Sequence, residues 1–129
     1  MSKFILDTSA ILAYLFNEPG VDLVADILME GNGVISSANY AELVSKLVSK
    51  NMPMPEIMEI TNGLDLEFIP QDKQQAQLAG ELWTISKPFG LSLGDRSCLA
   101  LGQMTQLPVL TANKIWKNVP AEVDIRIIR

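Results

Sequence analysis

The sequence contains no histidine and only one cysteine among its 129 residues. Without an imidazole, a Ser-His-Asp triad, a Cys-His pair and a two-histidine ribonuclease mechanism are all excluded, because each needs a side chain that moves protons near neutral pH. The same absence argues against zinc, which prefers nitrogen and sulfur ligands. A metal bound by this chain would therefore rest on oxygen ligands. Such ligands suit Mg²⁺ or Mn²⁺ held by one or two carboxylates and several water molecules.

The single cysteine and the lack of long apolar runs narrow the protein class further. Cys98 has no partner for an internal disulfide, and its apolar neighbours Leu99 and Leu101 indicate an ordinary core residue. No apolar run approaches the ~18 residues that a membrane span needs. Residues 1–3 lead directly into a strand-like segment, which is not typical of a signal peptide. We therefore expect a cytoplasmic protein without membrane association.

The length predicts a single domain, residues 1–129, that buries roughly two thirds of the surface its unfolded chain exposes. Hydrophobic residues make up 48% of the chain, and the mean hydropathy is +0.21. This is more apolar than a typical soluble monomer of this size. We therefore expect part of the surface to be covered by oligomerisation.

Short strand-like runs alternate with helical stretches of about 10 to 15 residues, a pattern typical of βαβ units and a parallel sheet. We predict strands near residues 4–7, 33–36, 66–69, 109–111 and 123–128. Helices are expected near residues 9–17, 21–29, 39–50, 71–86 and 93–104, with a short one after Pro55. In the third helix, the apolar side chains share one face, and Glu42, Lys46 and Ser49 share the opposite face.

Three acidic residues, Asp7, Glu42 and Asp95, follow apolar runs that lie far apart in the sequence. A fourth polar position, Asn113, follows the apolar run 109–112 and carries an amide instead of an acid. The carboxyl ends of parallel strands border one crevice, which is deepest where the strand order reverses. Residues roughly 90 positions apart can therefore meet there, and clustered carboxylates would favour a hard divalent cation.

Each acid also has a purely structural explanation. Asp7 could cap the helix that follows it. Glu42 could close a capping box with Asn39, three residues earlier, or pair with Lys46, four residues further along the same helix. Asp95 lies three residues after Ser92, the spacing of a capping box at a helix start. Independent caps need not converge on one edge of a sheet, so the joint arrangement favours a shared site.

Four motifs follow one another along the chain: Ile5-Leu6-Asp7-Thr8-Ser9-Ala10, Ser37-Ala38-Asn39-Tyr40-Ala41-Glu42-Leu43, Leu91-Ser92-Leu93-Gly94-Asp95-Arg96 and Val109-Leu110-Thr111-Ala112-Asn113-Lys114-Ile115-Trp116. In this order they resemble the motifs of PIN-domain nucleases, and above all those of the VapC-type toxins of bacterial toxin-antitoxin pairs. The resemblance extends from Phe4 to about Trp116 and implies a three-layer α/β sandwich. Its five-stranded parallel sheet would be flanked by helices, with the first and fourth strands adjacent at the centre.

The resemblance also implies a metal-dependent endoribonuclease, a hydrolase in which Asp7, Glu42 and Asp95 form a pocket for Mg²⁺, with Mn²⁺ able to substitute. We assign Asp7 and Asp95 as primary metal ligands, and Glu42 as a further ligand or as the group that orients the attacking water. Many family members carry a second aspartate where this chain has Asn113, the fourth candidate catalytic residue, which offers a neutral carbonyl but no charge. Candidates for contacts to RNA or to metal-bound water are Thr8, Ser9, Arg96, Thr111 and Lys114.

The net charge of −5 is unusual for a protein that handles RNA, because phosphate contacts normally come from Lys and Arg. The charges are unevenly distributed, however. Residues 1–86 hold four bases and twelve acids, whereas residues 87–129 hold six bases and three acids. The bases close to Asp95 and Asn113 could hold an RNA backbone or could be ordinary surface charges: Lys87, Arg96, Lys114 and Lys117.

The resemblance implies two protein partners, a second copy in a homodimer and a small VapB-like antitoxin. The methionines Met52, Met54 and Met58 could receive the antitoxin or fill gaps in the core.

Two other functions stay open at this point. One is a non-catalytic PIN-like binding module, in which Asn113 marks a lost activity. The other is a magnesium-binding receiver-like signalling domain, although its third strand would need to end in a phosphoacceptor aspartate, and here 69–71 is Ile-Pro-Gln.

Overall fold

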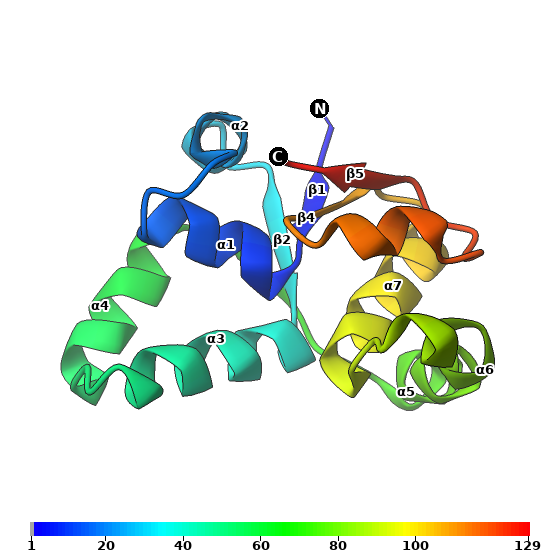
Figure 1. Cartoon of the computed structure of the whole chain (residues 1–129). Helices are drawn as coiled ribbons and strands as arrows, with labels where there is room; N and C mark the ends of the chain where they lie inside the picture. The colour runs from blue at the N-terminus through cyan, green and yellow to red at the C-terminus, as the bar shows by residue number, and fades with distance from the viewer. Residues whose placement is uncertain (1) are drawn as a thin grey trace.

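The computed structural model describes residues 2–129. Five parallel strands form one sheet in the order β3-β2-β1-β4-β5, so β1 and β4 are neighbours at the centre (Figure 1). The strand order therefore reverses between β1 and β4, as expected from the resemblance. The strands are β1 (Phe4–Leu6), β2 (Gly33–Ser36), β3 (Glu67–Ile69), β4 (Val109–Thr111) and β5 (Ile125–Ile127).

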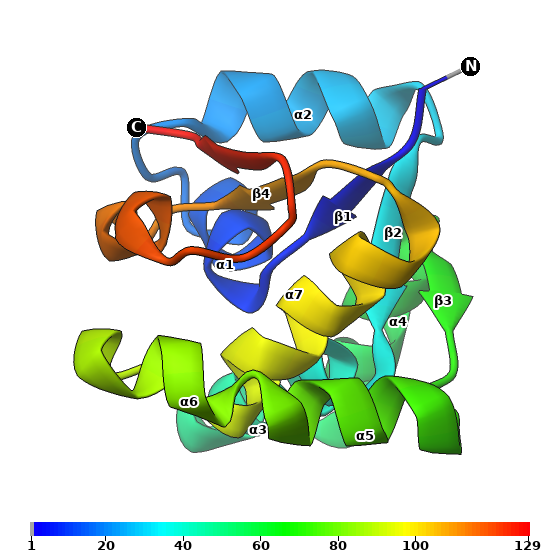
Figure 2. The same ribbon diagram turned by 90° about the vertical axis from the view of Figure 1, so that its right-hand side faces the viewer.

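Helices cover both faces of the sheet, which gives the expected three-layer sandwich (Figure 2). The α-helices are α1 (Thr8–Leu15), α2 (Val21–Met29), α3 (Ser37–Ser49), α4 (Met54–Gly63), α5 (Lys73–Glu81), α6 (Trp83–Ser86) and α7 (Leu93–Thr105), and the 3₁₀ helices are η1 (Lys87–Phe89) and η2 (Lys114–Asn118). Successive side chains of a strand point to opposite faces. Leu6 accordingly packs in one core with residues of α1 to α4, and Ile5 in the other with residues of α5 and α7.

One expected helix is divided in two. A single helix near residues 71–86 was predicted, but the structure has α5 and α6, which meet at Leu82. Gly80 has a low helix propensity, which weakens the helix just before this point. Leu82 itself is buried in the second core. The break is therefore the result of tertiary packing on a stretch with weak helical preference.

The methionine-containing stretch is divided between core and surface. Ile57 is fully buried, and Met52 packs against the first core. Met54 and Met58 on α4 are 47% and 42% exposed. This stretch thus fills the core and also presents apolar surface. Among residues 2–129, no helix is both long enough and apolar enough to cross a membrane.

Candidate metal-binding active site

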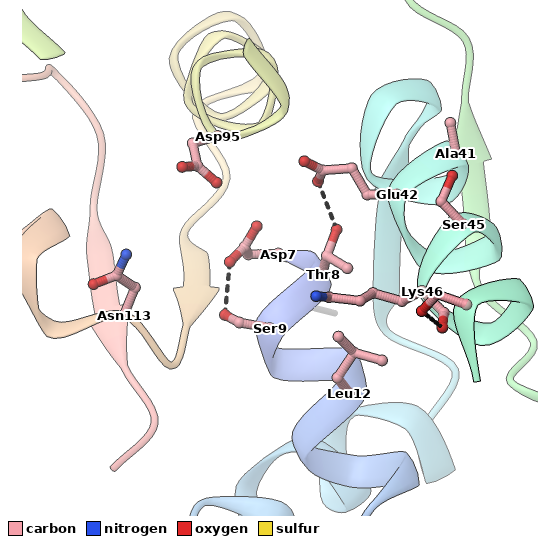
Figure 3. A pocket seen from close by; sticks show the side chains of 11 residues that line it. Asp7, Thr8, Ser9, Leu12, Ala41, Glu42, Ser45, Lys46, Asp95 and Asn113 are labelled. Carbon is pink, nitrogen blue, oxygen red and sulfur yellow. Dashed lines mark hydrogen bonds between the residues drawn. The ribbon is translucent and has the colours of Figure 1, made fainter. Parts of the chain in front are cut away.

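The four predicted catalytic residues come from four separate segments and line one cavity of about 610 Å³ (Figure 3). Asp7 directly follows β1, and Asn113 lies just beyond β4. Glu42 comes from α3, and Asp95 from the first turn of α7. Figure 3 shows the carboxylates of Asp7, Glu42 and Asp95 facing the same space. The cavity lies beyond the carboxyl ends of β1 and β4, where a switch point in the strand order opens a crevice.

The Asp7 side chain is held by two hydroxyl groups and does not cap α1. Asp7 occupies the N-cap position, yet its side chain makes no capping bond. Instead, Ser9 Oγ and Thr111 Oγ1 donate hydrogen bonds to Asp7 Oδ2 at 2.7 and 2.9 Å. The Asp7 amide donates to Leu110 O at 2.9 Å, which ties the end of β1 to β4. The capping explanation of Asp7 is therefore wrong, and its carboxylate is fixed at the cavity wall.

Burial makes Asp7 an unusual carboxylate, since only 4% of the residue is exposed. Removal from water raises the pKa of Asp7 from 3.8 to about 6. The hydrogen bonds from Ser9 and Thr111 oppose this rise in pKa, and the negative charges of Asp95 and Glu42 add to it. A cation in the cavity would relieve both the burial cost and the repulsion between carboxylates.

Glu42 is oriented by two donors. Thr8 Oγ1 and Asn39 Nδ2 each donate to Glu42 Oε1 at 2.9 Å. Asn39 is fully buried, and its own Oδ1 accepts a hydrogen bond from Ser36 Oγ at 3.0 Å. The Asn39 amide nitrogen also lies 3.5 Å from Asp7 Oδ1. Asn39 thus connects two of the three acids. Sequence reasoning did not select Asn39 as a site residue, although its position three residues before Glu42 was the available signal.

Asp95 combines a structural role with its place in the cavity. Ser92 and Asp95 form a complete capping box at the start of α7, in which Asp95 Oδ2 accepts from Ser92 N at 2.9 Å and Ser92 Oγ accepts from Asp95 N at 3.1 Å. The capping explanation is therefore correct for Asp95. Burial raises the pKa of Asp95, the bonds from Ser92 lower it, and the charge of Glu42 raises it further.

Gly94 allows Glu42 to approach the first turn of α7. A Cβ atom at Gly94 would lie 2.1 Å from Glu42 Oε2, far inside van der Waals contact. The approach of this carboxylate therefore requires a glycine. It brings Glu42 next to Asp95 and to the amino end of a helix, where negative charge is favoured.

Not all of the other predicted site residues line the cavity. Thr8, Ser9 and Asn113 line the cavity, and Thr111 is fully buried beneath Asp7. Asn113 Oδ1 accepts a hydrogen bond from Ile115 N at 3.2 Å, so the amide caps η2.

The basic residues expected to meet RNA lie outside the lining of the cavity. Arg96 Nε donates to Ser92 O at 3.4 Å, Lys114 is exposed at the start of η2, and the Lys87 ammonium lies 4.8 Å from the centre of the Trp83 ring. In the part of the chain that the structure describes, none of these three lines the cavity.

The carboxylates fit a hydrated cation better than a closed cage of protein ligands. Within residues 2–129, no three acidic, histidine or cysteine side chains lie close enough to surround one metal ion. Mg²⁺ usually keeps several waters and is held by only one or two carboxylates. Since Asp7 Oδ2 is engaged by two hydroxyls, Asp7 Oδ1 is the oxygen suited to such an ion. Asp95 and Glu42 are then suited to its waters or to a second direct bond.

The fold is a three-layer α/β domain with sheet order 3-2-1-4-5, and acids gather at the switch point between β1 and β4. This combination is the one that the resemblance to PIN-domain nucleases implied. The sheet order differs from the 2-1-3-4-5 order of receiver-like domains, so that alternative is wrong. The model of the PIN domain family matches residues 4–122. The chain therefore belongs to the PIN domain family, as the motifs predicted.

Several solved structures share this fold. DNA-bound VapBC from Salmonella typhimurium aligns over 100% of both chains with 21% identity and a TM-score of 0.75. FitAcB from Neisseria gonorrhoeae aligns over 97% of both chains with 20% identity and a TM-score of 0.74. A toxin-antitoxin complex from Klebsiella pneumoniae aligns over 98% of both chains with 16% identity and a TM-score of 0.71. No curated protein matches this chain in sequence.

Proposed function

We propose that the protein is an endoribonuclease that requires Mg²⁺ or Mn²⁺, and that it acts as the toxin of a VapBC-type toxin-antitoxin pair. One observation carries the enzymatic part of this proposal. Carboxylates of Asp7, Glu42 and Asp95, far apart in sequence, face one cavity at the switch point of the sheet. Family membership supports the same reading.

The chemistry follows from the arrangement of the side chains. When bound, a divalent ion would neutralise negative charge on the phosphodiester and lower the pKa of a bound water from about 15.7 towards neutrality. Asp7 and Asp95 would hold this ion, directly or through water. Glu42, kept in place by Thr8 and Asn39, would be a further ligand or accept a hydrogen bond from the attacking water and orient it towards the phosphorus. Ser9 and Thr111 keep the Asp7 carboxylate in one orientation.

The test is a cleavage assay on structured RNA with Mg²⁺, Mn²⁺ or EDTA, comparing wild type with Asp7→Asn, Glu42→Gln and Asp95→Asn. Each substitution removes one charge and keeps the shape, so we expect cleavage to fall by at least about 10²-fold, as for loss of one stabilising group in an active site. Asp26→Asn and Glu56→Gln change exposed acids on α2 and α4 and serve as matched controls. Wild-type protein that cleaves no RNA with either metal would instead be a non-catalytic PIN-like module.

Asn113 leaves the site with one charge less than many family members have. We propose that this weakens a second metal position before it affects the first. Asn113→Asp should then raise Mg²⁺ affinity and the cleavage rate, and an aspartate can still cap η2 in place of the amide. Isothermal titration with Mg²⁺ and a cleavage time course measure both. If both stay unchanged, the missing charge has no role.

We also propose that the protein is a homodimer bound by a VapB-like antitoxin, and that it is located in the cytoplasm. The structures of toxin-antitoxin complexes that share the fold support the antitoxin partner. Exposed apolar side chains on α4 and β3, Met54, Met58 and Phe68, offer surface for such contacts. Light scattering of the purified chain should give twice the monomer mass, and a monomer over the whole concentration range would contradict the dimer.

A further inference from the structure

A second cavity continues the candidate active site in one direction. It has a volume of about 270 Å³ and shares four lining residues with the first cavity, Ser9, Leu12, Lys46 and Ser49. The two cavities therefore form one depression between α1 and α3, which we call the α1–α3 groove. One end of the groove holds the three acids. The other end is lined by Phe16, Glu18, Lys50 and Arg129.

The charge changes sign along the α1–α3 groove. Lys46 and Lys50 are exposed, and within residues 2–129 neither forms an ion pair. Figure 3 shows the Lys46 side chain extended from α3 across the cavity towards α1. Arg129 Nη1 lies 3.4 Å from Glu18 Oε1, so its charge is partly neutralised. The two lysines are therefore the positive charges available to a ligand in this groove.

An aromatic ring accompanies these charges. Phe16 is 41% exposed, and the Lys50 ammonium lies 4.9 Å from the centre of its ring. Lysines that follow a groove next to an exposed aromatic ring are the combination that binds single-stranded nucleic acid, because ammonium groups contact phosphates and the ring stacks with a base. An acidic peptide would use the lysines and gain nothing from stacking, so the groove favours RNA.

We infer that the α1–α3 groove binds the single-stranded RNA backbone on one side of the cleaved phosphate, with Lys46 contacting the nearest phosphate and Lys50 the next. The RNA class of this ligand rests on the proposed function. This site differs from the basic segment 87–129 that the sequence pointed to, because both lysines come from the acidic half of the chain.

The test measures binding of a fluorescent single-stranded RNA oligonucleotide in EDTA, which keeps the measurement independent of cleavage. Anisotropy is followed from 25 to 200 mM salt for wild type, Lys46→Ala, Lys46→Glu and Lys50→Ala. Each alanine variant should lose affinity several-fold, and the slope of log affinity against log salt should become shallower by about 0.7 per lost phosphate contact. Lys46→Glu should lose more than Lys46→Ala. Lys73→Ala, at an exposed position on α5, is the control and should match wild type.

The possible results separate this inference from the proposed function. Wild-type protein that binds RNA through Lys46 but cleaves none in Mg²⁺ would support the groove and overturn the nuclease activity. Equal RNA affinity and equal salt slope in wild type and Lys46→Ala would overturn the groove, whatever the cleavage result, as would wild type that does not bind the oligonucleotide. A labelled heptaglutamate peptide is measured in parallel. Lys46-dependent binding of this peptide with Lys46-independent binding of RNA would make the groove an acidic-peptide site.

Discussion

Asp7 is the residue at which folding and the proposed function oppose each other. Its carboxylate is buried between β1 and β4 next to two other acids, and its pKa of about 6 shows that ionisation is unfavourable there. The hydroxyls of Ser9 and Thr111 reduce this cost without removing it. A folded protein that keeps such a group stores electrostatic free energy that a bound cation can release.

The first prediction concerns the stability of the metal-free protein. Between about pH 4 and pH 6 the folded protein holds a proton on Asp7 that the unfolded chain has lost, so the free energy of unfolding falls as the pH rises. A pKa raised from 3.8 to about 6 corresponds to about 3 kcal/mol lost above pH 6. Urea unfolding in EDTA at pH 4.5 and 7 spans most of this change, so wild type and Asp26→Asn should each lose about 2 kcal/mol between these two pH values. Asp7→Asn should show a clearly smaller loss, and an unchanged pH dependence in this variant would contradict the assignment.

Asn39 is the residue that organises the acids from beneath. It is fully buried, donates to Glu42 and accepts from Ser36. A carboxamide can do both at once, whereas an apolar side chain of similar size would leave the hydroxyl and the carboxylate with fewer partners. In the proposed mechanism, Asn39 is therefore a positioning residue that acts through Glu42.

The second prediction is that Asn39→Ala lowers both stability and cleavage. The Ser36 hydroxyl loses its acceptor and Glu42 loses one of two donors, a cost of about 1–3 kcal/mol for buried groups. If Glu42 orients the attacking water, kcat should fall while KM for RNA stays close to wild type. Asn62→Ala, at an exposed position on α4, is the matched control. A fall in stability with an unchanged kcat would make Asn39 a purely structural residue.

At the scale of elements, the contact between α3 and the first turn of α7 sets the width of the site. Glu42 from α3 reaches α7 only because Gly94 has no side chain. The capping box of Ser92 and Asp95 fixes where α7 begins, and therefore where Asp95 lies relative to Glu42. This contact thus holds α3 and α7 in the relative position that brings Glu42 and Asp95 to one cavity.

The third prediction compares two glycines within helices. Gly94→Ala places a Cβ atom against the Glu42 carboxylate and should displace either this carboxylate or the helix turn. A displacement of about 1 Å can cost on the order of 10²-fold in rate. Gly80→Ala on α5 meets open space and should stabilise the fold by about 0.5–1 kcal/mol without a change in activity. Full activity in Gly94→Ala would show that the close approach is dispensable.

The elements themselves were largely predictable, because strands and most helices follow from local hydrophobic period and turn residues. Helix α2 and strands β2 and β4 lie where the pattern placed them. The break at Leu82 was not predictable, since it depends on core packing between distant segments. For the same reason, the roles of Asn39 and Lys46 could not be predicted from the sequence. Their types and positions are visible in the sequence, but a hydrogen bond to Glu42 and a place in the groove depend on how α1, α3 and α7 meet.

At the scale of the whole molecule, the site lies between the two cores. Side chains of β1 alternate between the α1–α4 core and the α5–α7 core, and Asp7 follows at the point where β1 leaves both. Binding of a cation only to the folded protein therefore stabilises the entire domain.

The fourth prediction is that Mg²⁺ raises the free energy of unfolding, by about 2.7 kcal/mol when its concentration reaches 100 times the dissociation constant. Thermal unfolding at increasing Mg²⁺ concentration should show a rising Tm in wild type and in Asp26→Asn. Asp7→Asn should show little change, because it lacks the buried charge that favours the ion. Equal shifts in Asp7→Asn and wild type would place the ion elsewhere.

The adjacency of β1 and β4 has a consequence for the cell that makes this protein. β1 is synthesised first, yet it pairs with β4 only when Val109 has left the ribosome. Thr111, which holds Asp7, arrives with the same strand. Until then the growing chain carries its acids unassembled. The proposed activity can therefore appear only after β4 has been made and has paired with β1.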